Sequence, residues 1–302
     1  NNDRNVSGET PGTGLQITNS SPTVSNNQFT QNTKALVIES SSAPTVSGNT
    51  FSQNTTSAVE VNSSHPTFSS NTASGNGTNG IFLQGSISQN YTLSSNLPFV
   101  IQATYSVPAT TTLAIDAGTI VKLSGAGNIS ASGKINALGS SAAKIIFTSL
   151  HDDDCGISGG CGDTNATTTT PVAGDWDNIV FNSGAASSTL QYVVVRYGGN
   201  NDNPLSNPPR GALRLIGTSI DILNSTIEKN YIAGIWMQNS TSTVISDSII
   251  RDHSDSTSEV FYGINLTSTS TPLIKNTVFS NNETNIRADS TSSYTDGGGN
   301  SF

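Results

Sequence analysis

Three consecutive stretches of the chain repeat one pattern: LQITNSSPTVSNNQFTQN (residues 15–32), LVIESSSAPTVSGNTFSQN (36–54) and VEVNSSHPTFSSNTASGN (59–76). The repeat interval is 22 residues, and three sets of positions share it: Pro22/Pro44/Pro66, Phe29/Phe51/Ala73 and Asn32/Asn54/Asn76. A fixed period of this length is typical of proteins that stack one structural unit many times.

Each repeat opens with two apolar residues that are two positions apart, as a strand with one buried face requires. These pairs are Leu15/Ile17, Leu36/Ile38, Val59/Val61 and Ile81/Leu83, and the same unit returns as Leu213/Leu215, Ile235/Met237, Ile264/Leu266 and Ile286/Ala288. The second members of the later pairs are spaced 22, 29 and 22 residues apart. The spacing of 29 predicts one coil with a seven-residue insertion.

An Asn or Asp precedes a further short apolar strand in many repeats, at Asn27, Asn49, Asn224, Asp247 and Asn276. Asparagine side chains stacked at a turn can hydrogen-bond from one coil to the next. We therefore expect these positions to form one ladder along the molecule.

The period, the short strands and the Gly/Asn/Ser turns together predict an all-β fold, a right-handed parallel β-helix with about 22 residues and three short strands per coil. One coil cannot bury its own apolar face, so the coils must stack at about 4.8 Å. This explains why 33% hydrophobic residues suffice alongside 47 Ser, 38 Thr and 33 Asn. At most about 13 coils fit the chain length.

Longer segments in the middle of the chain strengthen this interpretation. They are Val107 to Leu123, Ile129-Ser-Ala-Ser-Gly133, Ile145-Ile-Phe147 and Gly174-Asp-Trp176-Asp-Asn-Ile179. With them the chain resembles the right-handed parallel β-helix repeat proteins, the pectin-lyase-like solenoids of secreted and cell-surface bacterial proteins. The resemblance covers nearly the whole chain and implies an extracellular or cell-surface location, but it specifies a fold rather than an activity.

Charge and hydropathy exclude several classes of function. Twelve Lys and Arg against 21 Asp and Glu give a net charge of −9, without a basic cluster that would follow a phosphate backbone. Nucleic acid is therefore not an expected partner. No apolar run approaches the roughly 20 residues of a transmembrane helix, so no membrane-spanning segment is predicted.

We divide the chain into three parts. Residues 1–90 are regular coils, residues 91–198 are less regular coils with a loop at 150–174, and residues 199–302 are regular coils with an insertion at 251–262.

The loop at 150–174 contains both cysteines of the chain, Cys155 and Cys161, and we expect them to form a local disulfide. Five residues near them carry oxygen ligands of the kind that Ca²⁺ prefers: Asp152, Asp153, Asp154, Asp163 and Asn165. The alternative is a solvated acidic turn stapled by the disulfide. Calcium is the one cofactor considered, and none is required by the sequence.

Four residues occupy the outward position of successive C-terminal strands: Arg214, Trp236, Asn265 and Arg287. Trp stacks on sugar rings, and Arg and Asn hydrogen-bond to hydroxyls or carboxylates, so this column is a candidate polysaccharide-binding face. The alternative is that the four residues are exposed surface side chains that bind no ligand.

His253, with Asp252 or Asp255, is a weak acid/base pair for a polysaccharide-degrading enzyme, but no paired carboxylates or known β-helix catalytic motif accompany it. The sequence therefore leaves catalytic activity open and favours its absence.

The two ends of the chain read as halves of one coil, because Gly299-Asn300-Ser301-Phe302 followed by Asn1-Asn2 continues the internal pattern. We expect Asn1, Asn2, Asn300 and Phe302 to form an end-to-end interface, either between stacked copies of the chain or between tandem repeats in a longer polypeptide. The alternative is that the two ends are frayed. The leading hypothesis is a structural extracellular solenoid, a unit of a fibre, stalk or adhesin. The alternative is a carbohydrate-binding module or a β-helix polysaccharide-degrading enzyme.

Overall fold

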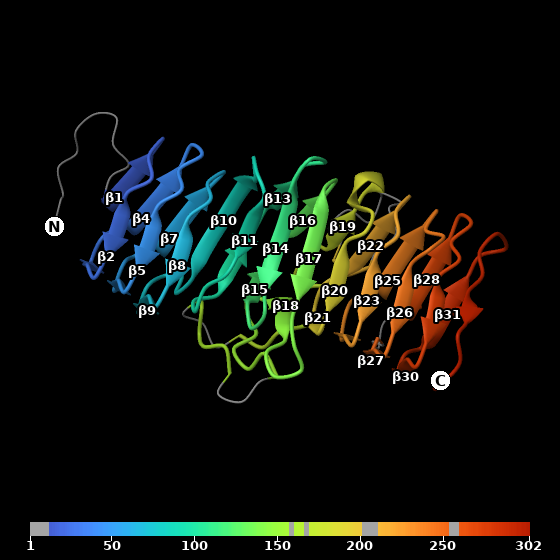
Figure 1. Cartoon of the computed structure of the whole chain (residues 1–302). Coiled ribbons are helices and arrows are strands. Elements are labelled where there is room, and N and C mark those ends of the chain that lie inside the picture. Colours follow the sequence, from blue (N-terminus) through green and yellow to red (C-terminus); the bar gives the residue numbers. More distant parts are fainter. Residues whose placement is uncertain (1–11, 157–159, 166–168, 201–210, 254–259) are drawn as a thin grey trace.

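The computed structural model describes residues 12–156, 160–165, 169–200, 211–253 and 260–302. Within these ranges the chain forms 32 strands and one short 3-10 helix, η1 (Ser183–Ala185). All named strand pairings are parallel, and the strands recur in a cycle of three. The result is a right-handed parallel β-helix, which Figure 1 shows from the side as a rod with β1 near one end and β31 near the other.

The first strands of the coils stack into one column. They are β1 (Thr13–Thr18), β4 (Lys34–Glu39), β7 (Ser57–Asn62), β10 (Ile81–Ser86), β13 (Thr104–Val107), β16 (Asn128–Ala131), β19 (Ile179–Phe181), β22 (Leu213–Ile216), β25 (Ala233–Gln238), β28 (Tyr262–Thr267) and β31 (Thr284–Ala288).

The second column contains β2 (Thr23–Ser25), β5 (Thr45–Ser47), β8 (Thr67–Ser69), β11 (Tyr91–Leu93), β14 (Thr112–Asp116), β17 (Lys134–Leu138), β20 (Thr189–Gln191), β23 (Asp221–Leu223), β26 (Val244–Ser246), β29 (Leu273–Lys275) and β32 (Thr295–Asp296).

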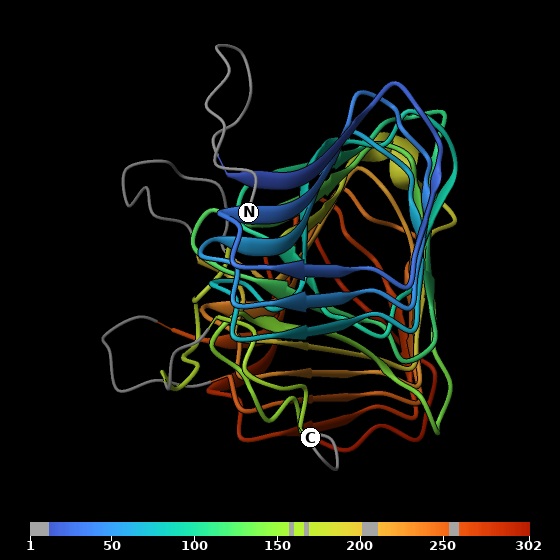
Figure 2. The same cartoon turned by 90° about the vertical axis from the view of Figure 1, so that its left-hand side faces the viewer.

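The third column contains β3 (Gln28–Thr30), β6 (Thr50–Ser52), β9 (Thr72–Ser74), β12 (Phe99–Ile101), β15 (Ile120–Leu123), β18 (Ile145–Ser149), β21 (Val193–Arg196), β24 (Thr226–Glu228), β27 (Ile249–Arg251) and β30 (Val278–Ser280). We number the coils 1 to 11 by their first strands. Figure 2 views the rod from its N-terminal end, with successive coils behind one another.

The core is continuous along the rod and follows the predicted apolar pairs. Leu15, Leu36, Val59 and Ile81 are register partners in the first column, as are Ile17, Ile38, Val61 and Leu83. The pairs of the C-terminal coils stack in the same way, from Leu213 and Leu215 to Ile286 and Ala288. The repeat pattern of the sequence therefore predicted the strand register as well as the fold.

Each corner of the coil combines a left-handed residue with a polar residue that bonds to the next coil. Between the second and third strands, the backbone N–H of Asn27 donates to Oδ1 of Asn49 (3.0 Å), and Asn49 repeats the bond to Asn71 (3.0 Å). At the next corner the series is Asn32, Asn54 and Asn76. The expected ladders of asparagine are confirmed for these coils.

The C-terminal part of the asparagine column differs from expectation by one residue. Asn224, Asp247 and Asn276 adopt positive φ (51°, 53° and 48°), so they occupy the left-handed position that Asn26 occupies in the first coil. The residue after each one forms the ladder instead, as Ser225 does by donating its backbone N–H to Oγ of Ser248 (3.1 Å). Asn is common at both positions because its side chain tolerates the left-handed conformation and also bonds locally.

The column pairings are interrupted between coils 3 and 4. The sheets β2–β5–β8 and β3–β6–β9 end there, and β12 pairs with β10 rather than with β9. The connecting segment carries Gly75, Gly77 and Gly80, and Cβ atoms at Gly77 and Gly80 would lie 2.5 and 2.7 Å from backbone oxygens. The close approach of backbone in this turn therefore requires glycine.

No helix long and apolar enough to cross a membrane occurs in the parts of the chain that the structure describes.

Candidate functional site

The described part of the loop that follows β18 lies beside the outer face of the third strand column (Figure 1). Its described residues 150–156 and 160–165, which we call the strap, contain the cysteines and most of the acidic cluster. Cys155 and Cys161 form the predicted disulfide. The strap covers strand residues that point away from the core, so several of them are buried although they are on the outside of the coil.

The covered residues include a row of charged side chains in the third column. Inward positions of these strands are apolar, as at Val121 and Val195, and the next residue faces outward. This outward position holds Lys122, then Thr148, Arg196, Glu228 and Arg251 in successive coils. The side chains of Lys122, Arg196 and Glu228 are 0%, 7% and 6% exposed, whereas that of Arg251 is 45% exposed.

Arg196 joins the strap to this row. Its Nε donates to Oδ2 of Asp152 (2.8 Å), and its Nη1 lies 3.6 Å from Oε1 of Glu228. Glu228 in turn accepts from Nε of Arg251 (2.9 Å). Thr148 Oγ1 also donates to the Asp152 carboxylate. Acids and bases alternate in the series Asp152, Arg196, Glu228 and Arg251, so each of its buried charges has a neighbour of opposite charge, as burial requires.

Lys122 holds the other half of the strap. Its Nζ donates to the carbonyl oxygen of Gly162 (2.9 Å) and lies 3.5 Å from Oδ1 of Asp153. Burial lowers the pKa of Lys122, and the nearby charge of Asp153 opposes that shift. The two lysine contacts fix the strap on coil 5, while Asp152 fixes it on coil 7.

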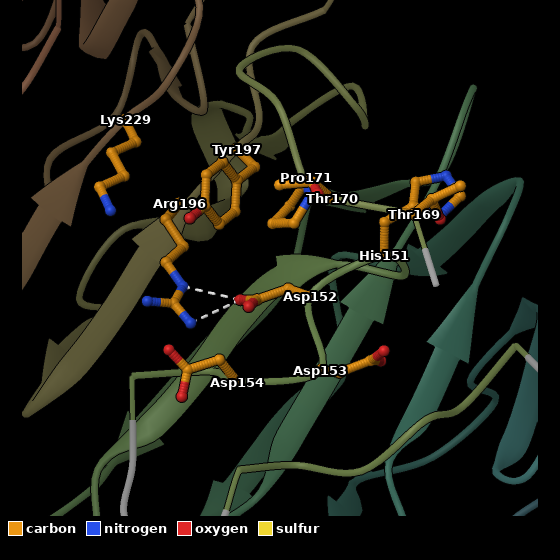
Figure 3. A pocket seen from close by; sticks show the side chains of 10 residues that line it. All are labelled: His151, Asp152, Asp153, Asp154, Thr169, Thr170, Pro171, Arg196, Tyr197 and Lys229. Atoms are coloured by element: carbon orange, nitrogen blue, oxygen red, sulfur yellow. Dashed lines mark hydrogen bonds and ion pairs between the residues drawn. The ribbon is translucent and has the colours of Figure 1, made fainter. Parts of the chain in front are cut away.

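A pocket of about 440 Å³ opens where the strap side of the molecule meets coils 7 and 8 (Figure 3). Figure 3 shows Tyr197, Arg196 and Lys229 on one side, and His151, Thr169, Thr170 and Pro171 on the other. Tyr197 has φ 65° and lies near two cations, with Arg196 Cζ 5.4 Å and Lys229 Nζ 5.9 Å from its ring centroid. On the side of coils 7 and 8, cationic side chains of the protein therefore lie next to the Tyr197 ring.

The five predicted calcium ligands do not converge on one point. Asp152 binds Arg196, Asp153 lies near Lys122, and Asp154 is exposed. Asp163 is also exposed and accepts the backbone N–H of Asn165 (3.2 Å). Among the described residues, no group of three or more His, Cys, Asp or Glu side chains is arranged to hold a metal ion. Calcium binding remains a prediction of the sequence. In the structure, Asp152 forms an ion pair with Arg196, and Asp153 forms one with Lys122.

The predicted glycan column is correctly registered, because Arg214, Trp236, Asn265 and Arg287 are successive partners in the first strand column. Trp236, however, is 2% exposed, against the expectation of an open stacking surface. The Arg214 guanidinium lies 5.5 Å from the indole ring, and burial lowers the pKa of Arg214. Strand alternation fixed the outward direction of Trp236, but direction alone does not determine whether a side chain is covered.

The far end of that column is open. Arg287 is exposed, and its Nη1 donates to Oδ1 of Asn265 (2.8 Å). Its guanidinium also lies 5.7 Å from the ring centroid of Tyr262. Glycan binding by the column remains a prediction, and Arg287 is its accessible member.

His253 is a corner residue rather than an accessible acid/base group. It is fully buried, with Nδ1 2.9 Å from Oδ1 of Asn282 and Nε2 3.4 Å from Nδ2 of Asn230. A Cβ at Gly234 would lie 2.5 Å from its Nε2, so this glycine leaves room for the ring. Burial lowers the pKa of His253 to about 4. Asp252 bonds to Asn281 (3.1 Å), and Asp255 lies outside the described residues.

The predicted end-to-end residues are described only at the C-terminal end. Asn300 accepts the backbone N–H of Thr277 (2.9 Å) and so continues a corner ladder. Phe302 stacks on Phe279 with ring centroids 5.2 Å apart and is 59% exposed. Asn1 and Asn2 lie outside the described residues.

Sequence reasoning missed the charged row that holds the strap. A signal existed, since Arg196, Glu228 and Arg251 each follow a strand's inward apolar residue. Their spacings of 32 and 23 residues depart from the 22-residue period, so the row becomes evident only after the coils are aligned.

Residues 2–104 match a sequence family described as right handed beta helix region. No curated protein matches the chain, and neither does any solved structure. The family match ends in coil 5, and the same three-strand cycle continues to the last described coil. The chain is thus a right-handed parallel β-helix whose first third matches that family.

Proposed function

We propose that the protein is a structural extracellular β-solenoid, a rigid scaffold that is extended at its coil ends by a further coil of the same kind. The observation that carries the proposal is the open face of coil 11. Among the described strands, β31 and β32 pair with β28 and β29 alone, so their other edges present backbone groups without a strand partner there. Such an edge is a template for another strand.

Side chains at this face continue the core. Phe302 lies in the inward row of the third column, stacked on the buried Phe279 at 13° between ring planes. At the other end of the described coils, Phe29 stacks on Phe51 at 5.3 Å and 15°. Phe29 also lines a hollow of about 520 Å³ with Leu15, Ile17 and Val24. An exposed aromatic side chain at one face and a hollow that contains Phe29 at the other are consistent with one end stacking on the other.

The residues that the sequence offered for catalysis or metal binding have structural contacts, which also supports a scaffold. His253 is enclosed in a corner ladder, and Asp152 and Arg196 hold the strap on the rod. A disulfide in the strap suits an oxidising compartment, which is our basis for proposing an extracellular location.

Sedimentation velocity over a range of concentrations tests the proposal. We expect the native chain to form larger species as concentration rises, and Phe302→Asp to remain a single rod. Leu138→Asp is the matched control, because Leu138 is also exposed (48%) but lies in the second column of coil 6, away from either face. Association that is equally lost in both variants, or absent in the native chain, would contradict the proposal.

Glycan binding is a second candidate, favoured by the exposed Arg287 held between Asn265 and Tyr262. An exposed guanidinium next to an aromatic ring suits a carboxylated sugar. Binding of acidic and neutral polysaccharides to the native chain and to Arg287→Ala checks this candidate. Retention of acidic polysaccharide by both proteins would rule out this site.

A further inference from the structure

The junction between coils 3 and 4 has fewer strand pairings than any other junction between the described coils. Two of the three strand columns are interrupted there, so β7–β10 is the one pairing of named strands that joins coil 3 to coil 4. The packed core and single bonds at the corners, such as the Asn71 N–H to Oδ1 of Asn96 (3.1 Å) and the Tyr91 hydroxyl to the Pro66 carbonyl (2.9 Å), complete the junction. In a solenoid each unit is stabilised largely by its interfaces with its neighbours. A junction with fewer strand pairings therefore separates more readily than the others.

The strap reaches this junction from a distant part of the sequence. At the third corner, the ladder of asparagines ends at Asn79, whose Oδ1 accepts both the backbone N–H and Nδ2 of Asn76 (2.9 Å each). Asn79 then donates its own backbone N–H to the carbonyl oxygen of Thr164 (2.8 Å) and its Nδ2 to that of Asp163 (3.2 Å). Thr164 is 1% exposed. The strap thus supplies the next acceptors of the interrupted ladder.

The same strap is anchored at two further points. The carbonyl of Gly162 accepts Lys122 Nζ on coil 5, and Asp152 accepts Arg196 Nε on coil 7. These contacts are side-chain anchors on the long C-terminal block of the rod. The strap therefore links the connector between coils 3 and 4, at Asn79, to coils 5 and 7, and coil 3 reaches it through the bond of Asn76 to Asn79.

The disulfide joins the two halves of the strap. Asp152 is in the half that contains Cys155, and Gly162 and Thr164 are in the half that contains Cys161. Within the strap, the Cys155 N–H donates to Oδ1 of Asp152 (3.0 Å), and the Cys161 N–H donates to the Asp153 carbonyl (2.9 Å). The covalent link is thus placed between the coil 7 anchor and the contacts at the junction.

We infer that the strap is a disulfide-locked clamp that couples coils 1–3 to the rest of the rod, and that reduction of Cys155–Cys161 selectively loosens coils 1–3. A dithiol reductant supplies the two electrons and two protons that convert the disulfide into two thiols, and is itself oxidised to a disulfide. This inference does not depend on whether the rod associates end to end.

Hydrogen exchange of the full chain, with and without a dithiol, tests the clamp. We expect amides in β5, β6, β8 and β9 to exchange faster on reduction, on the order of tenfold for a short disulfide loop. Amides of β24, β27 and β30 should not change, because they lie on the far side of the Arg196 anchor. Unchanged protection in coils 1–3, or equal loss in both groups, would overturn the inference.

Two variants separate the clamp from a purely local effect of the disulfide. Cys155→Ser with Cys161→Ser should exchange like the reduced protein and respond no further to the dithiol. Lys122→Met keeps the disulfide but removes the anchor on coil 5, and should loosen coils 1–3 in the same selective way. If the Lys122 variant protects coils 1–3 as the native chain does, the disulfide does not act through the strap and the inference fails. Should the double serine variant not fold, dithiol titration of the native chain provides the same comparison.

Discussion

Coils 1–3 and coils 7–9 place different chemistry at one and the same position of the coil. The outward residue that ends the third strand is Thr30, Ser52 and Ser74 in the first group. In the second group it is Arg196, Glu228 and Arg251. The inward neighbours are apolar in both groups, so the fold is the same. The inward row determines the solenoid, and the outward row is free to carry hydroxyls or charges.

The free-energy cost of these outward residues differs between the two groups, because the strap covers the charged row. Exposed hydroxyls keep their contact with water, whereas buried charges must be paired. The corner asparagines of coils 2 and 3 are also buried, but they are neutral and hydrogen-bond to one another. The comparison therefore predicts a ranking of substitutions, from the buried charges to the exposed ones.

The largest effect is expected for Arg196→Met. This variant leaves Asp152 and Glu228 buried without their shared cation, which should lower the free energy of unfolding by about 3–5 kcal/mol. Chemical denaturation measures it. The triple variant Asp152→Asn, Arg196→Met, Glu228→Gln removes all three charges and should recover most of the loss. If the single and triple variants are equally unstable, charge pairing is not the cause.

The next effect concerns pH. Burial lowers the pKa of His253 to about 4, and the unfolded chain has the ordinary value of about 6.5. The unfolded state therefore binds the proton more tightly, so stability from this group is full above pH 6.5 and is lost as the pH falls toward 4. The loss is on the order of 3 kcal/mol.

The matched variant for this pH effect is His253→Asn, because Asn occupies the same corner at Asn230 and Asn282. Denaturation at pH 7 and at pH 4.5 should show a smaller pH dependence for the variant than for the native chain. Identical pH profiles would mean that His253 does not remain neutral in the folded rod.

A somewhat smaller effect is expected at a neutral corner. Asn54→Ala removes the acceptor of the Asn32 N–H and the donor to the Phe29 carbonyl. Leaving such buried groups unpaired should cost about 2 kcal/mol by thermal or chemical unfolding. Asn62→Ala, an exposed position in coil 3, serves as the control and should change stability by less than about 0.5 kcal/mol. Equal costs at the two sites would remove the case for the ladder.

The smallest effect is expected for the ion pair of the N-terminal coils. Lys34 Nζ lies 2.8 Å from Glu60 Oε2, but the lysine side chain is 29% exposed and Glu60 also accepts from Ser57 (2.8 Å). Lys34→Met should therefore cost less than about 1 kcal/mol by chemical denaturation. A cost as large as that of Arg196→Met would show that burial does not distinguish the two regions.

The parts of the molecule that follow the local period were predictable from sequence. The pairs Leu15/Ile17 and Leu36/Ile38 gave the register, since a strand alternates its faces and the repeat aligns the coils. Trp236 was placed outward correctly, but its burial depends on how the surrounding chain packs, which strand alternation does not report.

The features that were not predicted depend on contacts between distant residues. Asp152 and Arg196 are 44 residues apart, so no local pattern links them. His253 is recognisable as a corner residue only once it is aligned with Asn230 and Asn282, across spacings of 23 and 29 residues that differ from the regular period.

Electron microscopy of the purified chain over a range of concentrations tests the scaffold most directly. Eleven coils at about 4.8 Å give a single rod on the order of 50 Å along its axis. The account predicts that rods join end to end, with lengths that are multiples of this unit, and that Phe302→Asp restores single rods. Single rods of the native chain at every concentration, with no end-to-end contacts, would contradict it.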